Sequence, residues 1–192
     1  MSFGFQTVAT ACHLLGKWDA GRAAARQCLA LDPGAQLATM RAAAFLAWME
    51  GSYSDGIHRL QDLLTSARAR RDMQGLSLSL ATLADWMLEL DRPEDGHALA
   101  REAAELLRTG GSWQPWPGFA FGPLAETVVR LGTPDAEDVL AEGEQQVESS
   151  EQYLGRPQLL RARGLLCERK GKLDRALEAL HAGAEALCVY IW

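Results

Sequence analysis

The sequence of 192 residues contains no asparagine and only three lysines, Lys17, Lys170 and Lys172. Without asparagine, it offers no acceptor for N-linked glycosylation. It has no stretch of roughly 18 uncharged apolar residues that would cross a membrane. Its first residues lack the basic flank and apolar core of a secretory signal. We therefore expect a cytoplasmic protein that does not bind membranes.

Basic charge and paired cysteines are also scarce. The formal net charge of −6 argues against direct binding of nucleic acid, which normally needs a basic surface. The sequence has no Cys-x-x-Cys pair, and its cysteines lie among Ala and Leu, as small buried apolar residues do. The four cysteines are Cys12, Cys28, Cys167 and Cys188, and the four scattered histidines are His13, His58, His97 and His181. We expect no metal site and no cofactor, since zinc needs three or four convergent ligands.

Catalytic motifs are missing as well. The sequence contains no phosphate-binding Gly-x-x-x-x-Gly-Lys-Ser/Thr loop, no Gly-x-Gly-x-x-Gly after a strand, no His-Glu-x-x-His and no Gly-x-Ser-x-Gly. The acidic stretch from Asp135 to Glu151 spreads its charge over much of one expected helix, which is typical of a solvated face. We therefore expect that the protein is not an enzyme.

A short pattern is present five times. A small residue is followed by a turn residue, then by an aromatic residue, Pro or Leu, and then by an Asp, Glu or Ser that starts a helix. The five sets are Ala9/Gly16/Trp18/Asp19, Ala44/Gly51/Tyr53/Ser54, Ala84/Asp91/Pro93/Glu94, Ala125/Gly132/Pro134/Asp135 and Gly164/Gly171/Leu173/Asp174. Small residues let two helices approach closely, and Gly or Asp tolerates a positive φ in the turn. A repeated helix-turn-helix unit must bury its apolar face against its neighbours.

The first and fifth units carry a family resemblance. Gly16-Lys17-Trp18-Asp19-Ala20 through Leu29-Ala30-Leu31-Asp32-Pro33, and Gly164-Leu165-Leu166 with Gly171-Lys172-Leu173-Asp174, resemble the tetratricopeptide repeat (TPR). The resemblance implies an all-α fold, a right-handed α-solenoid of about five TPR-like helical hairpins in one domain covering residues 1–192. The units are expected at residues 2–35, 36–74, 75–110, 119–152 and 156–192, with an irregular, aromatic-rich loop at 110–123.

In the TPR family, the first helices of the hairpins line a concave groove. The resemblance therefore implies a groove for a protein or peptide partner. Its residues here are Arg41, Phe45, Trp48, Met49, Asp85, Glu89, Glu126 and Arg130. An amphipathic peptide would suit this mixture of apolar and charged side chains. The alternative is that Phe45 and Trp48 pack between units, because large aromatic residues dominate both cores and binding surfaces.

Two further segments allow more than one interpretation. The loop at 110–123 either packs down between repeats or offers Trp113 and Trp116 to a ligand. The apolar end from Cys188 to Trp192 is unusual for a terminal repeat, whose outer face is normally polar. It suggests either that the chain is a fragment of a longer protein or that it self-associates through this end.

The long period and the segment from Leu154 to Leu166 resemble the helical-repeat sensor regions of large bacterial ATP-dependent transcriptional regulators, the maltotriose-activator type with a LuxR-like domain. That resemblance implies a module for protein–protein interaction or ligand sensing in transcription regulation and signal transduction. Its partner would be a protein, a peptide or a small-molecule inducer. The alternative is a free-standing TPR scaffold or adaptor that assembles partner proteins.

Overall fold

The structure is a computed structural model that describes residues 2–31, 37–110, 117–150 and 155–189. All regular secondary structure in these ranges is helical, as expected for an all-α protein. The helices are α1 (Ser2–Leu14), α2 (Trp18–Leu31), α3 (Leu37–Met49), α4 (Tyr53–Arg70), α5 (Met73–Glu89), α6 (Pro93–Thr109), α7 (Pro117–Leu131), α8 (Ala136–Ser150), α9 (Arg156–Arg169) and α10 (Leu173–Val189). None of the helices in the described ranges has the length and apolar character that crossing a membrane requires.

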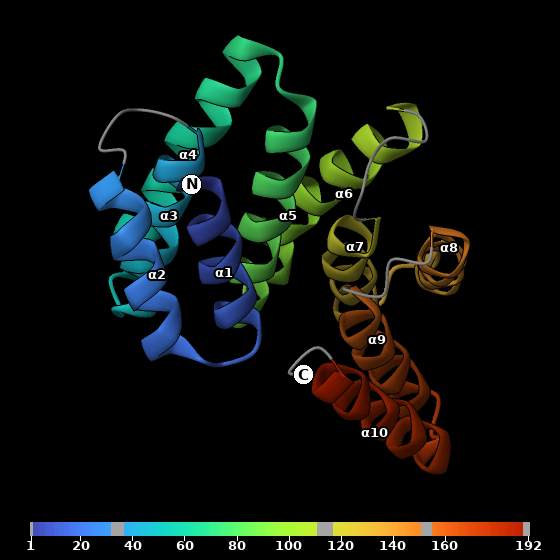
Figure 1. The fold of residues 1–192 in the computed structure, drawn as a ribbon. Helices are drawn as coiled ribbons and strands as arrows, with labels where there is room; N and C mark the ends of the chain where they lie inside the picture. The colour runs from blue at the N-terminus through green and yellow to red at the C-terminus, as the bar shows by residue number, and fades with distance from the viewer. Residues whose placement is uncertain (1, 32–36, 111–116, 151–154, 190–192) are drawn as a thin grey trace. The chain divides into compact units, whose positions relative to one another are not determined.

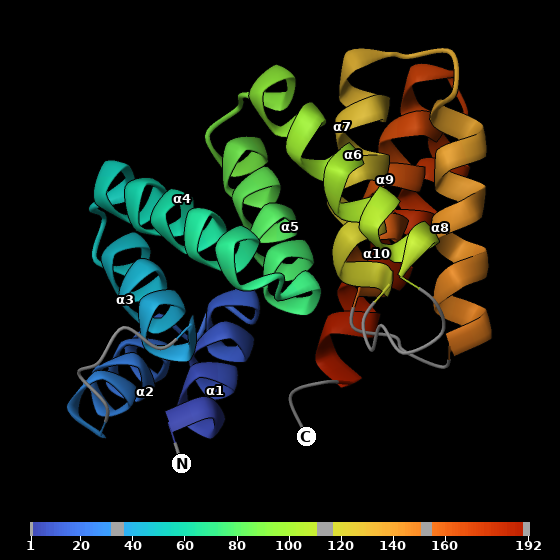
Figure 2. The same ribbon diagram turned by 90° about the horizontal axis from the view of Figure 1, so that it is seen from above.

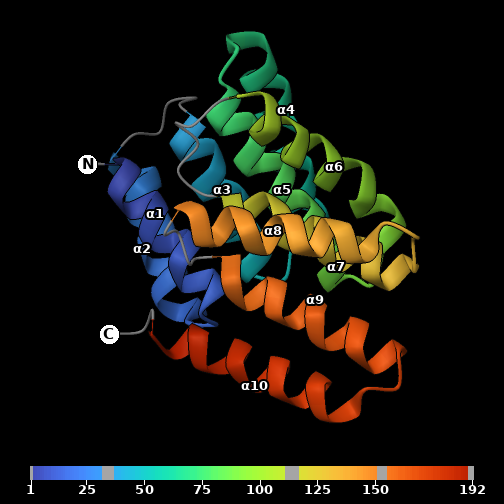
Figure 3. The same ribbon diagram turned by 90° about the vertical axis from the view of Figure 1, so that its right-hand side faces the viewer.

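The chain divides into two compact units, Met1–Ser79 and Leu80–Trp192, and the division falls within α5. In the first unit, α1 packs on α2 and α3, α2 packs on α3, and α3 packs on α4 (Figures 1 and 2). In the second unit, α6 packs on α7, α7 packs on α8 and α9, α8 packs on α9, and α9 packs on α10. Figure 3 shows α8, α9 and α10 side by side in chain order. Each unit thus repeats one rule, in which a helix contacts its neighbour in sequence.

The five predicted turns all have the expected left-handed backbone. Gly16, Gly51, Gly132 and Gly171 have φ values of 66°, 83°, 69° and 70°, and Asp91 has a φ of 56°. At each turn, the N–H of the turn residue and that of the next residue donate to carbonyls of the last turn of the preceding helix. This is the Schellman arrangement, which satisfies otherwise unpaired carbonyls at a helix end. The turn prediction is therefore confirmed.

The small residues that precede each turn lie in the core. Ala9, Ala44, Ala84 and Ala125 are at most 1% exposed, and Gly164 is buried. A Cβ atom on Gly164 would lie 2.8 Å from Cγ of Leu180 and 3.3 Å from the carbonyl oxygen of Ala176, both on α10. The two helices of this hairpin therefore approach too closely for a side chain at position 164, as the repeat pattern predicts.

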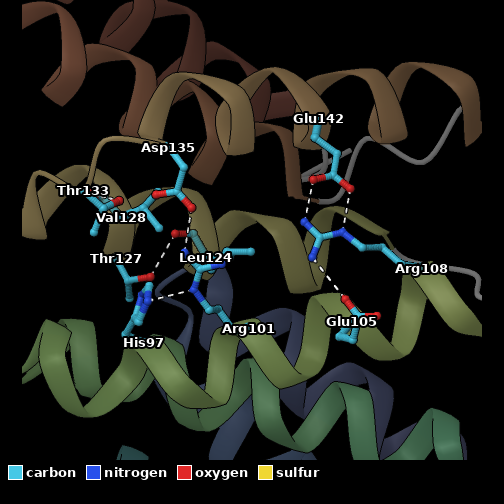
Figure 4. A network of polar contacts seen from close by, with 10 residues as sticks. All are labelled: His97, Arg101, Glu105, Arg108, Leu124, Thr127, Val128, Thr133, Asp135 and Glu142. Carbon is cyan, nitrogen blue, oxygen red and sulfur yellow. Dashed lines mark hydrogen bonds and ion pairs between the residues drawn. The ribbon is translucent and has the colours of Figure 1, made fainter.

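Ion pairs on the second helices of neighbouring hairpins follow the same register. Figure 4 shows Arg101 of α6 turned toward Asp135, with Nη2 of Arg101 2.6 Å from Oδ2 of Asp135. Arg108, about two turns further along the same face of α6, places Nη2 2.5 Å from Oε2 of Glu142 on α8. Both pairs join residues 34 positions apart. Because these side chains are about a third or more exposed, each pair contributes at most about 1 kcal/mol. They identify the register between hairpins and contribute little to stability.

Part of the irregular segment expected at 110–123 is helical. Helix α7 begins at Pro117 and runs through Pro123, so the prediction was wrong for residues 117–123. The glycines there serve close packing instead of breaking the helix. A Cβ atom on Gly118 would lie 2.6 Å from Cα of Gly155, just before α9. Trp113 and Trp116, the two residues suggested for ligand contact, lie outside the described residues.

Candidate binding surface

The groove residues predicted in the first unit are buried. Phe45, Trp48 and Met49 on α3 are 1%, 2% and 2% exposed. The ring of Trp48 lies 4.7 Å from the ring of Tyr53, measured between centroids, and the ring of Phe45 lies 5.2 Å from that of His13. The prediction that these three residues form an exposed groove was therefore wrong, and the alternative interpretation as core packing is correct.

Arg41 is also buried in the first unit, where it joins two helices. Its guanidinium donates to Oγ of Ser79 at 2.7 Å and to the carbonyl oxygen of Gly75 at 3.2 Å, both on α5. Burial lowers the pKa of Arg41 to about 10, and the nearby Asp72 carboxylate partly opposes this effect. Arg41 remains charged at neutral pH. It is held as a structural cation and is not available to a partner.

The predicted residues of the second unit behave differently, because the structure brings them together on α5, α7 and α9. Asp85 on α5 is half-buried and accepts a hydrogen bond from Nε2 of Gln158 on α9. Gln158 reaches across α7 at Gly122, where a Cβ atom would lie 2.5 Å from its Oε1. The missing side chain at position 122 therefore makes room for the contact.

The environment of Asp85 disfavours its charge. Burial first, and then the carboxylate of Glu89, raise the pKa of Asp85 to about 7, although Arg161 opposes the shift. The side chain of Glu89 is exposed. A half-buried carboxyl group that titrates near neutral pH is common at functional sites, although structural networks also produce such shifts.

Glu126 is the centre of this surface. Its side chain is fully buried, and Oε1 lies 2.7 Å from Nη2 of Arg130, one helical turn further along α7. Its other oxygen accepts from Nε of Arg161 on α9 at 2.8 Å. The side chains of Arg130 and Arg161 are 30% and 46% exposed. The buried carboxylate thus fixes two guanidinium groups that still reach solvent.

An open pocket of about 360 Å³ lies beside Arg130, at the ends of these helices. Its apolar lining comes from Pro93, Val129 and Leu165, and its charged lining from Asp91, Arg130, Glu168 and Arg169. Nη1 of Arg130 lies 3.3 Å from Oδ1 of Asp91, so the ion pairs of Glu126 continue to the edge of the pocket. We call the residues Asp85, Glu89, Glu126, Arg130, Gln158 and Arg161, together with this pocket, the α5–α7–α9 surface.

The groove residues predicted from the sequence include Asp85, Glu89, Glu126 and Arg130, but they do not include Gln158, Pro93 or Arg169. Gln158 carried a signal, because it precedes Arg161 by three positions and therefore lies on the same helix face. Pro93 and Arg169 carried none, since their place at the pocket depends on how neighbouring hairpins pack.

The α5–α7–α9 surface combines an apolar pocket with arginine and carboxylate side chains that are held by ion pairs. Within the described ranges, no three or more His, Cys, Asp and Glu side chains are grouped so that they could hold a metal ion. Searches with protein-family models and against curated protein sequences gave no match to this chain.

Proposed function

We propose that the chain is a protein-interaction or ligand-sensing module built as a right-handed α-solenoid of TPR-like hairpins. The five left-handed turns and the repeated packing rule within each unit support this architecture. Hydrogen bonds between residues about one repeat apart also support it, such as the 35-residue link between Arg161 and Glu126.

The binding function rests on one observation, the buried Glu126 carboxylate that holds two partly exposed arginines beside an apolar pocket. Side chains fixed in this way lose little conformational entropy when a ligand binds, which favours affinity. The expected partner is a protein or peptide that inserts an apolar side chain between Val129 and Leu165. It would place a carboxylate near Arg161 or Arg169.

A small-molecule inducer is the second candidate, favoured by the size of the pocket. Its volume of about 360 Å³ lies in the range of small-molecule sites. In this form, the chain would be the sensor part of a larger cytoplasmic bacterial regulator, and its ATPase and DNA-binding functions would lie in other segments. An in-frame coding segment for such a domain beside this sequence supports the sensor, and its absence supports a scaffold or adaptor.

The test is capture of partners from the source cells with the whole purified chain. Leu165→Glu and Arg169→Glu should each abolish capture of a specific partner. Leu165→Glu places a charge in the apolar pocket, and Arg169→Glu reverses the sign of the charge at the edge of the pocket. Leu31→Glu and Arg175→Glu are matched controls, since both residues are exposed and lie outside the pocket. If the pocket variants and the controls retain the same partner equally, the α5–α7–α9 surface is not the binding site. Thermal shifts with candidate inducers, repeated on Leu165→Glu, distinguish a small molecule from a peptide.

A further inference from the structure

Helix α10 carries an exposed apolar stripe that the α5–α7–α9 surface does not use. Leu173, Leu177 and Leu180 are 62%, 58% and 42% exposed, and Ala184 continues the stripe. Successive members are four, three and four residues apart, so they lie on one face of the helix. We call these four residues the α10 stripe. Three of them are leucines. Single exposed leucines are normal on a protein surface, whereas a contiguous row of them is typical of an interaction site.

Part of the same face is buried in the other hairpins. Ala25, Leu60 and Ala100 occupy the place of Leu180, counted from the turn residue of each hairpin, and all three are 0% exposed. In α8 the same count reaches Ala141, which is exposed, and the buried residue is its neighbour Leu140, 0% exposed. In α2, α6 and α8, the next helix of the chain packs on this second helix. Leu180 therefore lies at a place that is closed to solvent in three of the other hairpins, whereas in α10 it packs beside Gly164 of α9 and stays 42% exposed.

The remaining face of α10 is already occupied. Ala176 and Ala179 are 5% and 9% exposed, Gly183 is buried, and α10 packs on α9, as Figure 3 shows. A Cβ atom on Gly183 would lie 3.4 Å from Cβ of Leu160 on α9. The α10 stripe thus borders this packed face at Leu180, which lies beside Gly164 of α9, and it extends away from α9 through Leu173, Leu177 and Ala184.

We infer that the α10 stripe binds the α10 stripe of a second copy of this chain, with the two helices antiparallel. Spacings of four and three residues are those of core positions in a two-helix coiled coil, where Leu packs between side chains of the facing helix. A surface that pairs with itself around a two-fold axis gives a closed dimer. In such a dimer, Leu177 of one copy faces Leu180 of the other, and Leu173 faces Ala184.

The polar residues beside the stripe favour the antiparallel orientation. Asp174 and His181 flank it on the side away from α9, near its two ends. An antiparallel pair brings Asp174 of one copy next to His181 of the other, so that an imidazole N–H meets a carboxylate oxygen. A parallel pair would instead place Asp174 and His181 of one copy against the side of the other copy's helix that carries Ala176 and Gly183.

A head-to-tail assembly through α1 is less well supported by the surface. Val8 is the one exposed large apolar side chain among the α1 residues whose burial the structure describes, at 48%. A single valine does not form an apolar row on α1 that could pack along the three leucines of the α10 stripe. A contact between α10 and α1 would also leave a free α10 and a free α1 at the ends, so it would extend into open chains.

The test is sedimentation equilibrium of the whole chain over a concentration series. The wild-type chain should reach a dimer and no larger species. Leu177→Lys should raise the dimer dissociation constant about tenfold or more, because it buries a charge in the apolar contact. Val8→Lys is the matched control and should leave the dissociation constant unchanged. Circular dichroism and a melting curve establish that each variant is folded. If Leu177→Lys does not fold, Leu177→Gln is used in its place, with the same expected direction.

Three results would overturn the inference. The wild-type chain is monomeric at every concentration, or assemblies grow beyond the dimer, or Val8→Lys dissociates the dimer while Leu177→Lys does not. The last result would assign the contact to α1 instead. None of these results depends on whether the α5–α7–α9 surface binds a partner, so this inference and the proposed function fail separately.

Discussion

Replacing Trp48 with alanine distinguishes a core residue from a groove residue in the first unit. Trp48 is 2% exposed, and its ring centroid lies 4.7 Å from that of Tyr53, with the two rings tilted by 56°. Truncation of a fully buried tryptophan typically costs about 3–5 kcal/mol, through lost transfer free energy and a cavity that the surroundings fill only in part. Loss of the ring contact contributes to that cost, since an aromatic pair is worth about 0.5–1.5 kcal/mol beyond burial.

Urea unfolding of the whole chain, followed by far-UV circular dichroism, measures the free energy of unfolding. Trp18→Ala is the matched control, because Trp18 is the same residue type at 41% exposure and should lose less than about 1.5 kcal/mol. We expect Trp48→Ala to lose about 3–5 kcal/mol. If both variants lose the same small amount, Trp48 does not lie in the core, and the groove interpretation of α3 is correct after all.

Two further predictions concern the second unit. The raised pKa of Asp85 means that the folded state keeps its proton to a higher pH than the unfolded state does, from about 3.8 to about 7. The contribution of the protonated Asp85 side chain to the free energy of unfolding is therefore fully present below the unfolded pKa. It is lost as pH rises through about 7, and the loss is at most about 2–4 kcal/mol. Asp85→Asn should flatten this slope in urea unfolding at a series of pH values, and an unchanged slope would contradict the assignment. Gly164→Leu should lose about 1–3 kcal/mol by overpacking α9 against α10, as judged from melting curves. Gly4→Leu, with no heavy atom within 4 Å of its Cβ position, should lose nothing, and equal losses in both would contradict the close approach.

The turns and the small-residue column could be predicted because both are local requirements. A Schellman turn needs a residue that tolerates positive φ, and Gly or Asp stands at all five positions. The close contact within a hairpin needs a small residue, and the sequence places Ala or Gly there each time. These features repeat with the unit, so periodicity alone identifies them.

The burial of the apolar residues of α3 could not be predicted, because an apolar residue on a first helix suits either a core or a binding surface. Phe45, Trp48 and Met49 have the same spacing in both cases, and only tertiary packing decides. Charged residues carried more information. Glu126 and Arg130 lie one helical turn apart, and together with Asp85 they marked the surface that the structure assembles.

The start of α7 shows the opposite failure of local rules. Residues 117–123 contain two glycines and two prolines, which normally argue against a helix. Here tertiary contacts override propensity, because Gly118 and Gly122 let the helix approach Gly155 and Gln158 closely. No single-sequence rule distinguishes a glycine that ends a helix from one that lets a neighbour in.

The most direct test of the stacked-hairpin account is a double-mutant cycle on Glu126 and Arg161. These residues lie on first helices of neighbouring hairpins, 35 positions apart, with Nε of Arg161 2.8 Å from the Glu126 carboxylate. From urea unfolding of the wild type, Glu126→Gln, Arg161→Gln and the double variant, we expect a coupling energy of about 1–2 kcal/mol. The pair Arg101 and Asp135, both partly exposed, should couple by less than about 1 kcal/mol. A coupling near zero between Glu126 and Arg161 would show that α7 and α9 do not stack in this register.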